Sequence, residues 1–287
     1  MPSLKAIRGR IRSVKNTQKI TKAMKMVAAA KLRRAQESIL AARPFADRLE
    51  QVLAGIAERT DVTSHPLLAK RPIRKVELLV MTSDRGLCGG FNSNVLRRAE
   101  RFLYEGRDKY SQIEISTVGR KAHDHFAKRS AKLRHDYADI FEDLVYPVAQ
   151  RIADELASFF VEARLDAVFL LYNEFASAVS QKVTLTQLLP LPAPQASNKS
   201  SPVDFLYEPG PAGVLERLLP RALGVKIFRA LLESQAAEHA ARMNAMENAS
   251  NNAAEMITKL TLLANRTRQA AITKELMEIV SGAEALK

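Results

Sequence analysis

The stretch from Pro211 to Gly282 reads PAGVLERLLPRALGVKIFRALLESQAAEHAARMNAMENASNNAAEMITKLTLLANRTRQAAITKELMEIVSG, and it predicts one unbroken helix. No proline follows Pro220, and Gly224 is the last glycine before Gly282. Apolar or small residues recur mostly every three or four positions, which is typical of a coiled-coil heptad. These residues are Leu215, Leu218, Ala222, Val225, Leu232, Ala236, Met243, Met246, Ala253, Ile257, Leu260, Ala264 and Ala271. Such a helix is roughly 105 Å long, about twice the width of a globular domain of this size, so we expect it to need a partner along its length.

The N-terminal segment predicts that partner. Residues 4–56 continue the same heptad through Pro44, with a polar gap at Gln18, Thr21 and Lys25. The segment is about 54 residues, or roughly 80 Å, long. Both helices meet the intervening residues at one end, so we expect an antiparallel pair in which the C-terminal helix overhangs by about 25 Å.

The overhang, residues 268–287, carries Ile272, Leu276, Ile279 and Val280. A lone amphipathic helix is only marginally stable in water. We therefore infer that something else surrounds this end, the alternative being that it frays or folds back.

The middle of the chain alternates apolar strand-like runs with amphipathic helical ones, which favours a small α/β domain with a largely parallel sheet. The expected strands are residues 75–82, 112–118, 133–137, 166–172 and 182–189, with a possible edge strand at 203–207, and the expected helices are 93–110, 121–128 and 147–163. The predicted fold class is α/β: a long antiparallel coiled coil with an inserted Rossmann-like α/β domain. The predicted division is 1–58 plus 210–287 for the coiled-coil shaft and 74–208 for the insertion.

Charge and cysteine content narrow the function classes. The net charge is +13, and residues 1–36 hold eleven Lys or Arg before the first acid, Glu37. So much positive charge on one helix favours an acidic partner, either nucleic acid or an acidic protein surface. The alternative is a basic face that is exposed to solvent and binds no partner. The chain has no run of 18 apolar residues, and its N-terminal segment lacks the apolar core of a secretory signal, so we expect neither a transmembrane helix nor a signal peptide. The single Cys88 excludes an internal disulfide and fits a reducing compartment.

Catalytic motifs are weak throughout. The glycines of the loop at residues 83–92 match neither G-x-G-x-x-G nor a P-loop, so nucleotide binding is disfavoured. His123 and His125 are two residues apart and diverge on a helix, which argues against a metal site. Cys88 has no evident base partner, and no carboxylate pair has acid/base spacing. We expect no cofactor, no metal and no catalytic residue in this chain.

Three segments, in order, carry a resemblance that covers the whole chain. KNTQKITKAMKMVAAAK at 15–31, SDRGLCGGFN at 83–92 and ITKELMEIVSGA at 272–283, the last preceded by NRTRQA at 265–270, resemble the gamma subunit family of the F-type ATP synthases, bacterial type. The resemblance implies a non-catalytic central rotor stalk that couples proton translocation through a membrane ring to ATP synthesis or hydrolysis in a hexamer of alpha and beta subunits. It implies a peripheral position on the cytoplasmic face of the bacterial inner membrane.

The resemblance also implies contacts, residue by residue. Those with the beta subunit fall at Met24, Lys25, Arg268, Gln269 and Thr273. The tip that turns in an apolar bearing is Ile272, Leu276, Ile279 and Val280. The surface toward the epsilon subunit and the c-ring comprises Arg85, Gly86, Leu87, Cys88, Gly89, Gly90, Phe91, Leu206 and Tyr207. A delta subunit is a partner only indirectly, through the assembled complex, and with Cys88 alone no thiol regulation is expected.

Two competing classes remain. A basic coiled-coil nucleic-acid-binding protein would use the same N-terminal helix, but residues 1–44 lack the aromatic residues for base stacking. A nucleotide-dependent enzyme would use the loop at 86–90. The basic residues of the N-terminal helix also do not alternate with base-reading Asn or Gln clusters, and we expect no nucleic-acid partner.

Overall fold

The computed structural model describes residues 3–57, 65–129, 132–192, 208 and 210–284. The chain divides into two compact units. Unit 1 comprises residues 1–28 and 242–287, and unit 2 comprises residues 29–241. The predicted edge strand at 203–207 lies outside the described residues. The predicted domain division is not decided by these two units and stays a prediction.

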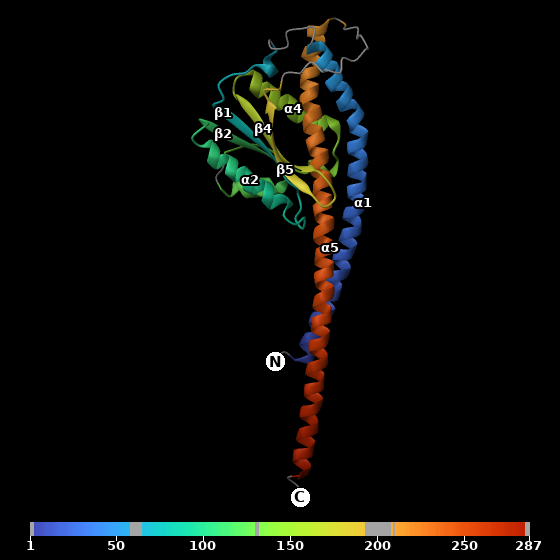
Figure 1. Cartoon of the computed structure of the whole chain (residues 1–287). Helices are drawn as coiled ribbons and strands as arrows, with labels where there is room; N and C mark the ends of the chain where they lie inside the picture. The colour runs from blue at the N-terminus through green and yellow to red at the C-terminus, as the bar shows by residue number, and fades with distance from the viewer. Residues whose placement is uncertain (1–2, 58–64, 130–131, 193–207, 209, 285–287) are drawn as a thin grey trace. The chain divides into compact units, whose positions relative to one another are not determined.

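Unit 2 is built on a five-stranded sheet with the order β3-β2-β1-β4-β5 (Figure 1). The strands are β1 (Lys75–Met81), β2 (Gln112–Val118), β3 (Leu133–Tyr137), β4 (Ala167–Phe175) and β5 (Gln181–Leu189). The first four pair in parallel, as the alternation with helices predicted, and β5 pairs antiparallel with β4. β4 and β5 follow each other directly, so they form a hairpin, in which the Ser177 N–H donates to the Ser180 carbonyl.

Helices cover both faces of this sheet. Helices α2 (Phe91–Gly106) and α3 (Arg120–Ala127) bury Val95, Phe102 and Phe126 against the sheet residues Leu78 and Val80. Helix α4 (Tyr146–Val161) and parts of the two long helices cover the other face, and their apolar residues form one larger core with it. Alternate residues of β1 point into the two cores, which is why this strand is apolar along most of its length.

Helix α2 ends four residues earlier than the sequence predicted. The amides of Lys109 and Tyr110 both donate to the Gly106 carbonyl, which closes the helix. The Tyr110 ring and Ile113 then pack directly over Gly106, where a Cβ would lie 2.7 Å from Ile113 Cδ1. The chain therefore turns toward β2 at the one glycine of this segment.

The two long helices are α1 (Leu4–Ala57) and α5 (Pro211–Glu284), and each is continuous, as predicted. Proline lies inside both, at Pro44 and Pro220. Near Pro220, Gln150 Nε2 of α4 donates to its carbonyl at 3.4 Å. Gly224 makes this close approach possible, because a Cβ there would lie 2.3 Å from Gln150 Oε1.

In unit 1, the start of α1 packs antiparallel against the part of α5 between residues 242 and 264 (Figure 1). Lys25 Nζ lies 2.7 Å from Glu247 Oε1 across the seam. The buried residues are Ile7, Thr21, Ala28, Met246, Ala253 and Ala264. The polar gap predicted in the seam is therefore real: Thr21 is buried, and Gln18 and Lys25 are half-buried.

Candidate functional site

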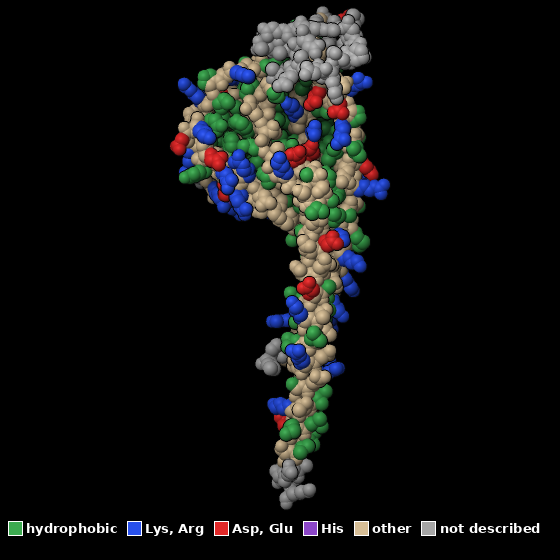
Figure 2. Space-filling model, viewed as in Figure 1, with side chains coloured by type: hydrophobic (Ala, Val, Ile, Leu, Met, Phe, Trp, Pro, Cys, Tyr) green, Lys and Arg blue, Asp and Glu red, His purple; other side chains and the backbone are tan. Residues whose placement is uncertain are grey.

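The last turns of α5 expose a row of large apolar side chains. Ile272, Leu276, Ile279 and Val280, the residues predicted for an apolar tip, are all at least half exposed. Met277, which the heptad stripe did not include, is also exposed. Within the described part of α5, no residue from 265 to 281 is buried. Figure 2 shows hydrophobic side chains along this end of the helix, an arrangement that indicates an interaction surface.

Polar residues of α5 adjoin this row. Arg268, Gln269 and Thr273, which the family resemblance assigned to contact with a beta subunit, are all exposed. Among the described residues, none forms an ion pair or a hydrogen bond with the side chains of these three. Their side chains are therefore available to a partner.

The basic segment of α1 is solvent-facing. Of its eleven Lys and Arg residues, Lys25 is half-buried and the other ten are exposed. Lys25 pairs with Glu247, and Arg33 pairs with Glu37 on its own helix; the rest have no ion pair within the described residues. Uncompensated positive charge on one helix face is complementary to an acidic surface.

Apolar residues interrupt this basic face. Ile20, Met26 and Val27 are each more than half exposed, and Met24 beside them is half-buried. Of these four residues, only Met24 was predicted as a contact, and that prediction came from the family resemblance. A contact surface on α1 is therefore mixed, with cations around an apolar strip.

The loop between β1 and α2 in unit 2 is held from within. Asn92 accepts from the Ser83 amide at 3.0 Å, and its Nδ2 lies 3.2 Å from Cys88 Sγ. Asp84 Oδ1 accepts from the Arg120 amide at 3.0 Å, which ties the loop to α3. Cys88 and Phe91 are buried, with Phe91 packed near Ala237 of α5. The loop is thus fixed on its inner side by contacts with α2, α3 and α5.

The outer side of the same loop presents one apolar residue. Leu87 is 66% exposed and has a φ of 63°, a left-handed conformation that is uncommon outside glycine. Gly86, Gly89, Gly90 and Arg85 are exposed around it, and Arg85 Nη2 lies 3.6 Å from Glu142 Oε1. An exposed leucine held in a strained conformation indicates a contact residue. Leu206 and Tyr207, predicted for the same surface, lie outside the described residues.

A buried charge cluster, which the sequence analysis missed, lies under α4. Glu77 of β1 is fully buried, and its Oε1 accepts from Arg134 Nη2 at 2.6 Å and from Ser116 Oγ at 2.5 Å. Arg134 Nη1 also donates to Glu155 of α4 at 2.8 Å. Burial raises the pKa of Glu77, and the Arg134 guanidinium opposes that rise. The cluster joins three strands to α4, so its role is structural.

The two histidines of α3 are both engaged by carboxylates. His123 Nδ1 lies 3.4 Å from Asp136, and His125 Nε2 lies 2.9 Å from Glu100. Among the described residues, no group of three or more His, Cys, Asp or Glu side chains is placed to hold a metal ion. Within the same residues, no helix has the length and apolar character needed to cross a lipid bilayer.

Comparison with known proteins identifies one family. A family model described as ATP synthase matches residues 3–286. The ATP synthase gamma chain of Anaeromyxobacter sp. (strain Fw109-5) is 54% identical over 290 residues, covering 100% of both chains. The ATP synthase gamma chain of Geobacter metallireducens is 52% identical over 287 residues, again covering 100% of both chains.

Solved structures agree with this match. A chain in the central stalk and c-ring structure of the Tetrahymena thermophila mitochondrial ATP synthase is 28% identical, with a TM-score of 0.62, over 80% of this chain and 99% of that chain. A chain in the rotor of the Euglena gracilis mitochondrial ATP synthase shares the fold, with a TM-score of 0.66 at 20% identity, over 94% of this chain and 98% of that chain.

Proposed function

The chain belongs to the ATP synthase gamma-chain family, and we propose that it is the central rotor stalk of an F-type ATP synthase. In this role it couples proton translocation through the membrane c-ring to ATP synthesis or hydrolysis in the hexamer of alpha and beta subunits. The observation that carries the proposal is the 54% identity to a bacterial gamma chain over the full length of both proteins. The chain itself carries no catalytic residue in this proposal.

The exposed end of α5 supports a position inside a ring of partners. Ile272, Leu276, Ile279 and Val280 are the tip that turns in an apolar bearing formed by the hexamer. Burying such side chains stabilises an interface by roughly 25 cal/mol per Å² of apolar surface. Because apolar contacts are non-directional, they hold the tip without favouring one rotational angle.

The basic face of α1 supports contact with acidic loops of the beta subunit. Met24 and Lys25 on α1, and Arg268, Gln269 and Thr273 on α5, are the proposed contact residues. The polar gap at Gln18, Thr21 and Lys25 suits a shaft that moves past its neighbours, because Gln18 and Lys25 remain partly exposed and polar groups in contact with water exchange partners easily. Substituting Lys25→Leu should change torque or coupled ATP synthesis, and no change in either would overturn this role of the gap.

The remaining partners are assigned from family membership. The loop at residues 85–91, with Leu206 and Tyr207, is the proposed surface toward the epsilon subunit and the c-ring. Delta is reached only through the assembled complex. The proposed location is peripheral, on the cytoplasmic face of the bacterial inner membrane.

Reconstitution tests the function directly. The full chain is mixed with its cognate alpha and beta subunits, and the product is scored by size and ATPase rate. We expect one large complex with a single copy of this chain and raised ATPase activity. Failure to join the complex, together with DNA or RNA binding that weakens steeply with salt, would favour the nucleic-acid alternative.

Variants separate the tip from the rest of the surface. The double substitution Leu276→Ser with Ile279→Ser should lower the yield of complex or its ATPase rate. Val179→Ser is the matched control, because Val179 is 82% exposed in the β4–β5 turn of unit 2. Equal complex yields and ATPase rates for the two variants would contradict the proposal that the tip turns in an apolar bearing.

Cross-linking tests the loop. Leu87→Cys in a Cys88→Ser background places one exposed thiol at its outer side. A cross-link to epsilon or to a c-ring subunit would support the proposed contact. A cross-link to alpha or beta would instead show that the loop contacts the hexamer.

A further inference from the structure

A cavity of about 350 Å³ lies in unit 2 between α1 and α5, beside Pro44. Small and apolar side chains form most of its wall: Ala42 and Ala46 of α1, and Val225 and Leu232 of α5. Phe45, Phe228 and Tyr146 add aromatic rings. The volume and the mainly apolar wall are typical of small-molecule sites, which range from roughly 300 to 1,000 Å³.

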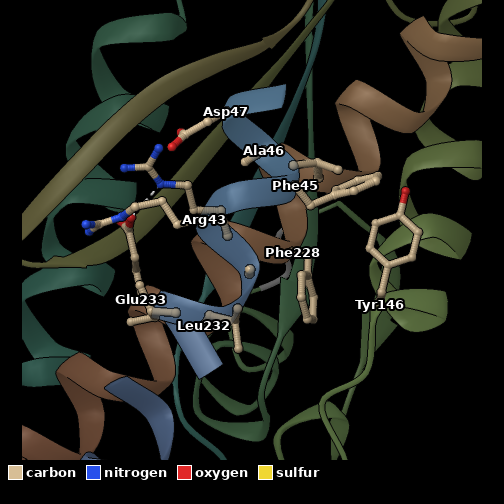
Figure 3. Close-up of a pocket in the computed structure, with 12 residues that line it drawn as sticks. Arg43, Phe45, Ala46, Asp47, Tyr146, Phe228, Leu232 and Glu233 are labelled. Carbon is tan, nitrogen blue, oxygen red and sulfur yellow. Dashed lines mark hydrogen bonds and ion pairs between the residues drawn. The ribbon is translucent and has the colours of Figure 1, made fainter. Parts of the chain in front are cut away.

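The cavity has a charged end and an aromatic end (Figure 3). Phe45, Phe228 and Tyr146 lie on one side of the view, and Arg43, Asp47 and Glu233 lie on the other. A ligand that fills it must therefore be amphipathic, with a polar head and an apolar body.

The charges at that end differ in how they are compensated. Arg229 Nε donates to Glu233 Oε1 at 2.8 Å, and Glu233 also accepts from the Tyr172 hydroxyl at 3.3 Å. The side chains of Arg43 and Asp47 make no ion pair or hydrogen bond with any residue that the structure describes. Within the described residues, the Arg43 guanidinium is therefore a cation in the cavity wall without an ion-pair partner, and the exposed Asp47 carboxylate lies one helical turn away.

A second cavity, of about 440 Å³, shares Phe45 and Tyr146 with the first. Its wall includes Arg217 and Arg221, whose side chains also have no ion pair with the described residues. No carboxylate lines this second cavity. Among the described residues that line the two cavities, three arginines and one aspartate have no ion-pair partner, so the region favours an anion.

We propose that the cavity between α1 and α5 is a binding site for an amphipathic organic carboxylate of the medium-chain fatty-acid type. The carboxylate accepts a two-pronged hydrogen bond from Arg43, the geometry for which a guanidinium is suited. The alkyl chain follows Ala42, Ala46 and Leu232 toward the aromatic end. The proposal does not depend on the function proposed above, because it concerns unit 2 alone.

Titration calorimetry on the full chain tests this site with three probes of equal chain length: decanoate, decanol and decylamine. We expect decanoate to bind more tightly than decanol, and decylamine to bind least. Arg43→Gln should weaken decanoate binding about tenfold and leave decanol unchanged, since a charge-assisted hydrogen bond contributes roughly a factor of ten or more. Asp47→Asn should strengthen decanoate binding.

Two further variants serve as controls. Arg48→Gln removes the same charge from the same helix, but Arg48 lies outside the cavity and donates to Gln51 at 3.1 Å. It should leave decanoate binding unchanged. Ala46→Phe should fill the cavity and abolish binding of both decanoate and decanol, with circular dichroism confirming that the variant keeps its helices.

Three outcomes would overturn the proposal. Equal affinity for decanoate and decanol would remove the role of Arg43. Binding that survives Ala46→Phe would place the ligand elsewhere. Binding by the isolated chain that disappears when the chain joins alpha, beta and epsilon subunits would show that a partner protein covers this surface.

Discussion

The two units of this chain bury their apolar residues in opposite ways. In unit 2, large side chains such as Ile152, Leu156 and Phe160 have no exposed surface, and cores lie on both faces of the sheet. In unit 1, four of the six buried residues in the described part are alanine or threonine, while large apolar residues such as Leu276 and Ile279 are exposed. Unit 2 is therefore stabilised by its own core, whereas unit 1 presents side chains whose burial requires another protein.

We expect the largest loss of stability when the buried ion pair of unit 2 is broken. Arg134→Ala leaves the Glu77 carboxylate buried without its cation, and we expect it to lower the free energy of unfolding by about 3–5 kcal/mol. Hydrogen exchange of the β1 and β2 amides, measured by mass spectrometry, reports this loss within the unit. Arg129→Ala is the control, because Arg129 pairs with Glu100 at an exposed site and should cost at most about 1 kcal/mol. Similar losses in both variants would contradict a structural role for the cluster.

Replacing glycine by alanine should change stability in opposite directions in the two units. Gly119 has a φ of 87°, and a Cβ there would lie 2.3 Å from the Thr82 carbonyl oxygen, so Gly119→Ala should destabilise unit 2 by roughly 2 kcal/mol or more. Gly9 lies in α1 with nothing within 4 Å of its Cβ position, so Gly9→Ala should stabilise its helix by up to about 1 kcal/mol. Thermal unfolding of the two variants measures the contrast. Destabilisation by Gly9→Ala would show that unit 1 is packed more tightly than its exposure indicates.

Sequence patterns predicted the helices and strands of both units, but not the side-chain contacts between them or the conformation of the loops. The heptads of α1 and α5 and the apolar runs of the five strands are local signals, and the helix ends at Leu4 and Ala57 follow from them. The pairing of Glu77 with Arg134 depends on strand order, which places residues 57 positions apart side by side. The left-handed backbone conformation of Leu87 could not be predicted either, because a leucine gives no local sign of a positive φ.

The ion pair across the seam of unit 1 should contribute less than either change in unit 2. Lys25 and Glu247 are 38% and 46% exposed, so their coupling in a double-mutant cycle should be about 0.2–1 kcal/mol and should fall as salt rises. The cycle uses Lys25→Ala, Glu247→Ala and the double variant, with stability taken from urea unfolding. A salt-independent coupling above about 2 kcal/mol would mean that the seam of unit 1 excludes water as the core of unit 2 does.

The smallest effect on stability should come from the largest exposed side chains. Leu276→Ser with Ile279→Ser removes two large apolar groups from α5, yet we expect the isolated chain to change by no more than about 0.5 kcal/mol, because neither group is buried. In unit 2, Ile152→Val removes a single buried methyl group and should cost about 0.5–1.5 kcal/mol. Urea unfolding of both variants compares them directly. A loss above about 1 kcal/mol at the tip would mean that residues of the chain itself cover it, and the reason for assigning that surface to a partner would be gone.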